Sequence, residues 1–311
     1  MSPGWVAATV RAKAMARRRL GAGAAHRLAS APSLADALGM LDGTAYARAA
    51  MPGASGATLP EAEQLVAAAE LWQLRVLAGW LPRSAVGLAR ALGARYELLN
   101  IEAHALALGD PRRRSTYHEL GSLALSWPRI AATTSVAELR VALAASPWGD
   151  PGDEWAETLH DLLLIRWLRM LAAEAPRAGE WVSGAAVLIA AKQLLVATRG
   201  PAESVARALA PLIGSDWVRT RSVPGLRTAA PSAGRWVLDG IGSPAEIWRA
   251  EAGLAARIES DGFRLLRQGT PGVDPVLGAV AVLAVDGRRV RAALADAAYG
   301  TGPGEVLDVL A

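Results

Sequence analysis

The chain has 311 residues, a formal net charge of +4 and no cysteine. The missing cysteine excludes disulfides, thiolate nucleophiles and metals bound by sulfur. Hydrophobic residues make up 52% of the sequence, enough for one large core or for two to three smaller ones. They are mostly alanine and leucine, whereas strands favour β-branched and aromatic side chains, so the composition predicts an all-α protein.

The composition favours neither a nucleic-acid-binding protein nor a membrane-spanning one. Arginine supplies nearly all the positive charge and is dispersed, and few aromatic side chains are available to stack on bases. The longest apolar runs, 184–191 and 276–285, stop at a charged residue and fall short of the roughly 20 residues that span a bilayer. The arginine-rich start lacks the apolar core of a secretory signal and predicts a first helix over 4–20.

The next part of the chain predicts a short helix followed by two long ones. Ser33 opens the short helix, which closes near Tyr46. A loop rich in proline and glycine leads to long helices over 61–81 and 84–108, the second with a break expected near Gly93. Apolar stripes on two sides of the first long helix indicate that it is buried between neighbours.

The same order of elements recurs further along the chain. Ser135 opens a short helix, and long helices follow over 154–175 and 181–198. Prolines and glycines then recur over 211–244, which predicts short turns and irregular backbone. The chain closes with another long pair, predicted over 245–267 and 275–299.

A serine followed three residues later by an acid stands at three of the helix starts, in 33–36, 135–138 and 243–246. The hydroxyl accepts an N–H of the first turn while the acid reaches back to the serine. The copies lie roughly a hundred residues apart, and helical repeats normally stack into one structure. The spacing predicts three helical repeats, over 1–114, 115–200 and 201–311.

Signatures of catalysis, cofactors and metals are missing from the sequence. Neither lysine follows a glycine as a phosphate-binding P-loop requires, and the glycines near residue 21 predict the end of a helix. The four histidines are scattered, and His104 and His160 are interpreted as partly buried, hydrogen-bonded side chains of helices. No paired aspartates occur that would hold magnesium. We therefore predict a non-enzymatic protein with no cofactor and no metal.

Three clusters of arginine are the other candidate features. Those at 17–19 and 112–114 adjoin predicted helix C-termini, where they complement the helix dipole. The third, at 288–291, follows Asp286, and an ion pair with Arg289 three residues on explains part of it. Because these arginines project on more than one face, the last helix is the strongest candidate for a contact surface.

The last helix resembles the C-terminal motif of the C-type rotor subunits of V-type and A-type ATPases, a family whose vacuolar member is the d-type subunit. That motif has a glycine, a tyrosine, an apolar stretch, an acid and then Arg-Asn-Leu-Arg. Four residues of this chain match it: Gly278, Asp286, Arg288 and Arg291. Three depart from it, since Ala279 replaces the tyrosine, Arg289 the asparagine and Ala284 one of two acids.

Two other stretches are similar to the same family. Its internal motif, an acid followed three residues later by Asn-Ile/Leu-Lys, is similar to residues 97–102. The counterpart at 187–192 keeps Lys192, but Val187 and Ala190 replace the polar pair. The Val-Arg-Ala at 10–12 resembles the opening helix of the family, so that the resemblance covers essentially the whole chain. The departures suggest a divergent, bacterial member.

The resemblance implies a funnel of three pseudo-symmetric helical lobes without catalytic residues. Such a protein is a rotor part on the cytoplasmic face of the membrane. It sits on the proteolipid ring and accepts the foot of the central stalk during ATP-driven ion transport or ATP synthesis. The residues expected to contact these partners are Asn100, Glu102, Lys192, Arg288 and Arg291. Ion pairs and caps between long helices are an equally open interpretation of each.

Three other function classes stay open. A generic helical-repeat scaffold for another complex would have the same sequence pattern. An all-α enzyme would have a deep pocket with converging carboxylates. A nucleic-acid-binding protein would release its ligand steeply as salt rises. Co-purification with a central-stalk protein or a proteolipid ring separates the rotor part from these alternatives.

Overall fold

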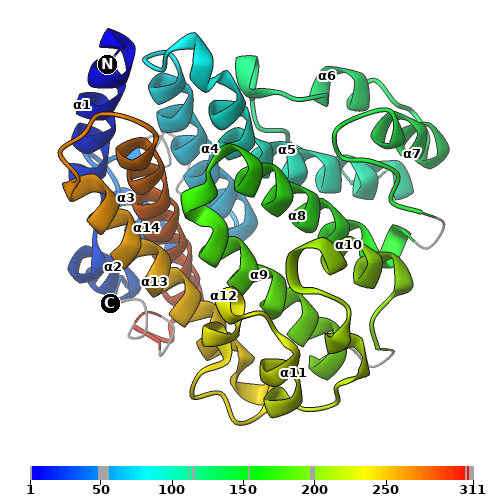
Figure 1. Cartoon of the computed structure of the whole chain (residues 1–311). Helices are drawn as coiled ribbons and strands as arrows, with labels where there is room; N and C mark the ends of the chain where they lie inside the picture. Colours follow the sequence, from blue (N-terminus) through cyan, green and yellow to red (C-terminus); the bar gives the residue numbers. More distant parts are fainter. Residues whose placement is uncertain are drawn as a thin grey trace. The chain divides into compact units, whose positions relative to one another are not determined.

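The computed structural model describes residues 2–47, 56–110, 112–113, 116–152, 155–196, 200–304 and 307 (Figure 1). Helices account for most of these residues, and none of the described residues lies in a β-strand. The predicted all-α fold class is therefore confirmed. The chain divides into two compact units, one formed by Met1–Val86 with Ala255–Ala311 and the other by Gly87–Leu254.

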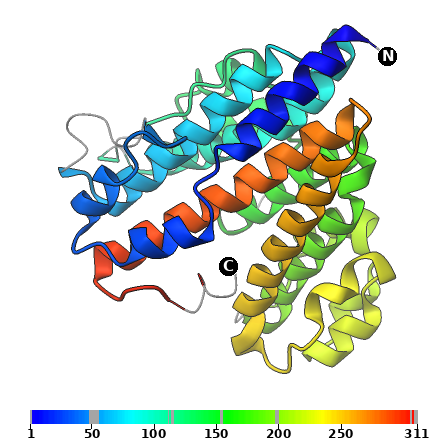
Figure 2. The same ribbon diagram turned by 90° about the vertical axis from the view of Figure 1, so that its left-hand side faces the viewer.

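The first unit combines the two ends of the chain. Its N-terminal part contributes α1 (Pro3–Arg17), α2 (Ala22–Ala29), α3 (Leu34–Gly39) and α4 (Leu59–Ala78). Its C-terminal part contributes most of α13 (Ile247–Arg267) and all of α14 (Val273–Tyr299). The last helix, α14, packs against α1, α2, α3 and α4, and Figure 2 shows it running alongside α1.

The core of the first unit surrounds the C-terminal half of α14. Val290 and Leu294 are fully buried and lie in one cluster with Leu28 of α2 and Leu38 of α3. A helix that meets neighbours on all sides has to be apolar on all sides, as the sequence of α14 is. The helix ends at Gly300, whose φ of 66° is left-handed and favours glycine.

Helices α13 and α14 follow one another in the chain and cross with their backbones in contact (Figure 2). A Cβ atom added to Gly278 would lie 2.6 Å from the carbonyl oxygen of Gly262. One added to Gly262 would lie 3.0 Å from the carbonyl oxygen of Gly278. Glycine at both positions therefore allows an approach that any side chain would prevent.

The second unit is a contiguous stretch built around α9 (Gly179–Ala191), which is buried along most of its length. The helices that pack on α9 are α8 (Trp155–Glu174), α10 (Glu203–Ile213) and α12 (Ser232–Arg235). The same unit holds α5 (Val86–Gly109), α6 (Trp127–Ile130), α7 (Val136–Ala144), α11 (Val223–Ala229) and the start of α13. A second apolar cluster joins α5, α7 and α8 around Trp148.

The predicted long helices are confirmed with small shifts at their ends. The break expected near Gly93 is wrong, because α5 runs through it without interruption. An added Cβ at Gly93 would lie 2.9 Å from the Cβ of Leu123, so the glycine serves close packing. The predicted boundaries at residues 114, 154 and 198 lie outside the described residues.

The stretch 211–244 is more regular than the sequence predicts. It holds α11, α12 and several 3₁₀ turns, and α10 continues through Pro211. Pro224 and Pro231 stand at the starts of α11 and α12, where the missing N–H has no helical partner to lose. Prolines that predicted irregular backbone thus mark the beginnings of short helices.

All three predicted serine caps are confirmed as helix starts. The hydroxyls of Ser33 and Ser135 each accept the N–H of the acid three positions on, and Ser243 forms a full capping box. Thr58 forms another full box at the start of α4. Ser243 and Thr58 lead into long helices, whereas Ser33 and Ser135 open short ones. The signature therefore marks helix starts in general, and the three-repeat plan stays a prediction that needs other support.

Replacing Gly278 by alanine is expected to destabilise the protein by about 1–3 kcal/mol, the usual cost of overpacking a tight contact. Urea unfolding followed by far-UV circular dichroism measures the change. Gly253→Ala is the matched control, because Gly253 lies on α13 with nothing within 4 Å of an added Cβ. That control should gain about 0.5–1 kcal/mol from better helix propensity. Equal effects of the two variants would contradict the crossing.

Candidate partner-binding site

Asp286 of α14 is fully buried and joins three segments of the first unit. Its carboxylate accepts the backbone N–H of Leu20 at 2.8 Å and of Gly21 at 2.7 Å, the two residues that precede α2. It also accepts the hydroxyl of Tyr46 at 2.9 Å. Three donors satisfy this carboxylate, which is the condition under which a buried acid is tolerated. The contacts hold α14, the start of α2 and the segment after α3 together.

Glu97 of α5 makes the same set of contacts in the second unit and is also fully buried. Its carboxylate accepts the backbone N–H of Leu125 at 2.6 Å and of Ser126 at 2.9 Å, the two residues that precede α6. The third donor is the indole N–H of Trp148, at 2.9 Å. We call each arrangement an acid clamp: a buried carboxylate, two consecutive N–H groups ahead of a short helix, and an aromatic donor.

The agreement between the two clamps extends to the residues around them. In both units the aromatic donor stands thirteen residues after the capping serine, over 33–46 and 135–148. Two residues before the aromatic, the hydroxyl of Thr44 or Ser146 donates to a leucine carbonyl, at 2.6 and 2.7 Å. Each hydroxyl then accepts the N–H of the aromatic residue at 3.1 Å. Two parts of the chain thus build one local structure twice.

The third position of this pattern is apolar. Val187 of α9 stands where the sequence comparison places the acid, and Ala190 stands where it places the amide. Both side chains are fully buried in the second unit. Exchange of a buried polar group for an apolar one is tolerated when all partners change together, so this position keeps the packing without the clamp.

Two of the three arginines on α14 form ion pairs within the first unit. Arg289 is 2% exposed, and its guanidinium donates to both carboxylate oxygens of Glu259, at 2.7 Å for one of them. Arg291 donates to Glu70 at 3.0 Å, and its side chain is 18% exposed. Arg288 is exposed on the surface. Among the arginines of this helix, Arg288 is thus the one most accessible to a partner.

Gly287 makes room for one of these ion pairs. A Cβ atom added there would lie 1.4 Å from Oε1 of Glu70, closer than any non-bonded contact allows. The absence of a side chain at Gly287 therefore lets the Glu70 carboxylate lie against α14 and reach Arg291.

Asn100 of α5 is 1% exposed and bonds to the backbone of His118. Its amide donates to the carbonyl of His118 at 2.9 Å, and its side-chain oxygen accepts the N–H of His118 at 2.7 Å. This pairing satisfies both ends of the amide and holds the segment ahead of α6 against α5.

Glu102 and Lys192, predicted as contacts from different repeats, lie in one exposed cluster of the second unit. His160 of α8 contacts Glu102 at 2.5 Å and is close enough to Lys192 to feel its charge. Lys192 pairs with Glu251 of α13. Lys192 also begins a π-helical turn, Lys192–Val196, in which one extra residue re-aims the side chains that follow. We call these four side chains the Glu102–Glu251 cluster.

Histidine pKa values differ between the cluster and the interior. The hydrogen bond to Glu102 raises the pKa of His160 above its usual value, helped by the charges of Glu102 and Asp161 and opposed by burial and by Lys192. Burial lowers the pKa of His104, whose ring nitrogens contact Tyr117 and Thr133. Both histidines are hydrogen-bonded as predicted, but the side chain of His160 is 64% exposed rather than partly buried.

Several residues that complete these sites were not singled out from the sequence. They are the clamp donors Tyr46 and Trp148 and the ion-pair partners Glu70, Glu251 and Glu259. The equal distance from capping serine to aromatic in the two units is the signal that could have found the donors. The acids carry no such signal, because each meets its arginine or lysine across a large gap in sequence.

Within the described part of the chain, no group of three or more His, Cys, Asp or Glu side chains is arranged to hold a metal ion. The helices of the same residues include none that is both long and apolar enough to cross a bilayer. No protein-family model and no curated protein matches this chain.

Replacing Tyr46 by phenylalanine is expected to destabilise the protein by about 1.5–3 kcal/mol at pH 7, because a buried carboxylate loses one hydrogen bond. Burial, then the charges of Asp286 and Glu70, raises the pKa of Tyr46 well above 10.0. The neutral phenol therefore stabilises the fold fully below pH 10 and loses that contribution as pH rises through the raised pKa. Urea unfolding should show a decline above pH 10 in the wild type that is shallower in the variant.

Tyr299→Phe is the control for this experiment, because Tyr299 is 75% exposed. It should unfold like the wild type at every pH. A Tyr46→Phe variant with the stability and pH slope of that control would contradict the clamp.

Replacing Glu102 by glutamine is expected to lower the pKa of His160 toward its ordinary value, because the charged hydrogen-bond acceptor is lost. Titration of the histidine ring signals by NMR measures this. In the wild type His160 should titrate above 6.5 and His104 below it. His104 serves as the internal control and should not move. An unchanged His160 titration in Glu102→Gln would show that the pair does not form.

Proposed function

We propose that this chain is a non-catalytic rotor component of a V-type or A-type rotary ATPase. In this proposal it couples the central stalk to the membrane-embedded proteolipid ring. It works at the cytoplasmic face of the membrane, and three helical repeats form its funnel. The resemblance of the last helix and of residues 97–102 to the C-type ATPase rotor family is the starting point.

The acid clamp is the observation that carries the proposal. The two stretches that resemble the family's acid motifs, at Asp286 and Glu97, hold their acids in the same way. Two weak sequence likenesses thus correspond to one structural element used twice, which supports a chain built from repeats. The apolar third position, at Val187, fits a repeat that has lost its clamp.

The position of α14 is a second support. The last helix packs with the first helices of the chain in one unit. A ring of repeats needs such a closure, because otherwise its first and last members would each leave an apolar face uncovered. A part that transmits torque also needs stiffness, and a buried helix tied by a clamp and two ion pairs supplies it.

The contact residues of the proposal fall into two groups. Arg288, Glu102 and Lys192 are accessible enough to meet a partner directly. Asn100 and Arg291 are largely buried and hold their helices in place. In the proposed rotor, the first group binds the stalk or the ring and the second shapes the surface that does so.

Co-expression of the chain with the central-stalk protein and the proteolipid ring of the same organism tests the proposal. Size-exclusion chromatography should show that the chain elutes with the stalk protein or with the detergent-solubilised ring. Arg288→Ala should weaken this association about tenfold, as loss of an accessible contact arginine does at protein interfaces. Arg83→Ala is the matched control, an exposed arginine elsewhere in the same unit.

Separate elution of a folded chain from both partners would contradict the rotor assignment. It would leave the helical-repeat scaffold for another complex as the remaining interpretation. Equal loss in both arginine variants would show that the association depends on overall charge and not on the α14 surface.

A further inference from the structure

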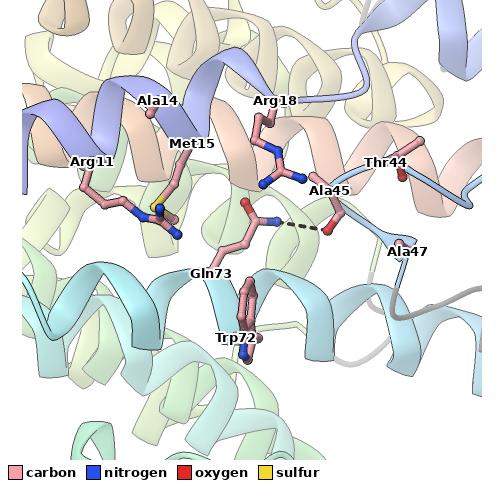
Figure 3. Close-up of a pocket in the computed structure, with 9 residues that line it drawn as sticks. All are labelled: Arg11, Ala14, Met15, Arg18, Thr44, Ala45, Ala47, Trp72 and Gln73. Atoms are coloured by element: carbon pink, nitrogen blue, oxygen red, sulfur yellow. Dashed lines mark hydrogen bonds between the residues drawn. The ribbon is translucent and has the colours of Figure 1, made fainter.

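A pocket of about 230 Å³ opens in the first unit between α1, α4 and the segment that follows α3 (Figure 3). Arg11 and Arg18 enter it from α1, and Trp72 and Gln73 from α4. Figure 3 shows both guanidinium groups reaching from α1 toward α4, with the amide of Gln73 between them. Small side chains, Ala14, Thr44, Ala45 and Ala47, complete the lining together with Met15.

The charges that line this pocket are not balanced. The described residues of its walls include two arginines and no acid. In the same part of the chain, the buried Nε–H of Arg11 has no hydrogen-bond acceptor. An unsatisfied buried donor is costly, and structures retain one where a ligand or a function uses it. Arg289 and Arg291 of the same unit, in contrast, each have a carboxylate partner.

The wall of the pocket is held in place by the acid clamp. Thr44 and Ala45 line the pocket, and the next residue, Tyr46, is bonded to Asp286. Gln73 adds a hydrogen bond from its amide to the carbonyl of Ala45, at 3.5 Å. The segment is therefore fixed before a ligand arrives, which lowers the entropy lost on binding.

We propose that this pocket binds a phosphate monoester whose attached ring packs on Trp72. Near neutral pH a phosphate monoester carries about −1.5 to −2 charges, which matches the two arginines. A carboxylate would leave one arginine unbalanced. Guanidinium groups bind phosphate oxygens in pairs of parallel hydrogen bonds. The proposal does not depend on the rotor function.

The size and polarity of the pocket limit the ligand. Its volume is below the roughly 300–1,000 Å³ of pockets that enclose drug-sized molecules, so the phosphate enters and the rest of the ligand stays at the mouth. The indole of Trp72 is 40% exposed, which leaves its surface open to a flat ring. A nucleoside monophosphate has both groups. A lipid headgroup that ends in a phosphate monoester shares the first alone.

Isothermal titration calorimetry with AMP, inorganic phosphate and succinate tests the proposal on the full chain. AMP and phosphate should bind at millimolar concentration or better, AMP more tightly. Arg11→Gln and Arg18→Gln should each weaken both by about tenfold or more, as expected for loss of a hydrogen bond to a charged group. Trp72→Ala should weaken AMP by about tenfold and leave phosphate unchanged, because only the ring stacks.

Arg17→Gln is the matched control, since Arg17 is exposed on the same helix and does not line the pocket. It should bind AMP as the wild type does. Circular dichroism melts confirm that each variant is folded. Flotation with vesicles of phosphatidylcholine and phosphatidic acid tests the lipid source, and binding lost in Arg18→Gln would identify it.

Three results would overturn the proposal. The first is the absence of binding by AMP, phosphate and the vesicles to the folded wild type. The second is an equal loss in Arg17→Gln and Arg18→Gln, which would indicate a diffuse charge effect. The third is succinate binding more tightly than phosphate, which would identify the pocket as a dicarboxylate site.

Discussion

A buried carboxylate has to find donors for all its oxygens, and this requirement organises the first unit. Asp286 meets it with two backbone N–H groups and one phenol, drawn from two segments that are distant from α14 in sequence. Each donor would be costly to leave unpaired, so the segments are held in one arrangement. The apolar contacts around α14 supply most of the stabilisation, and the carboxylate selects which of many similar packings is formed.

The second unit meets the same requirement with Glu97, and an apolar position at Val187 avoids it. The two solutions fit what is known of buried polar groups. A complete set of partners is stable and specific, and an apolar replacement of the whole set is stable as well. A single exchange, in which only the acid or only its donors change, is the costly intermediate.

The sequence predicted the fold class and most helix limits because the signals are local. Proline after a helix, glycine at its end and a hydroxyl at its start act over a few residues. The same local reading failed at Gly93, whose partner Leu123 lies thirty residues away. It also missed the regular structure of 211–244, because a proline at the start of a short helix and one in an irregular loop look alike in sequence.

The candidate site divides along the same line. Arg288 and Lys192 are exposed, as a contact residue needs to be, but Asn100 and Arg289 are buried against partners that no spacing rule reveals. Whether a charged residue of a helix faces solvent or a distant acid is decided by tertiary packing.

The clamp at Asp286 joins residues 265 and 266 positions apart. A ribosome therefore releases α1 to α4 long before the helix that completes their core exists, whereas the contiguous unit from 87 to 254 can be finished during elongation. The N-terminal helices wait with their apolar faces uncovered until the last helix is made. The nascent chain thus folds its middle first and its two ends last.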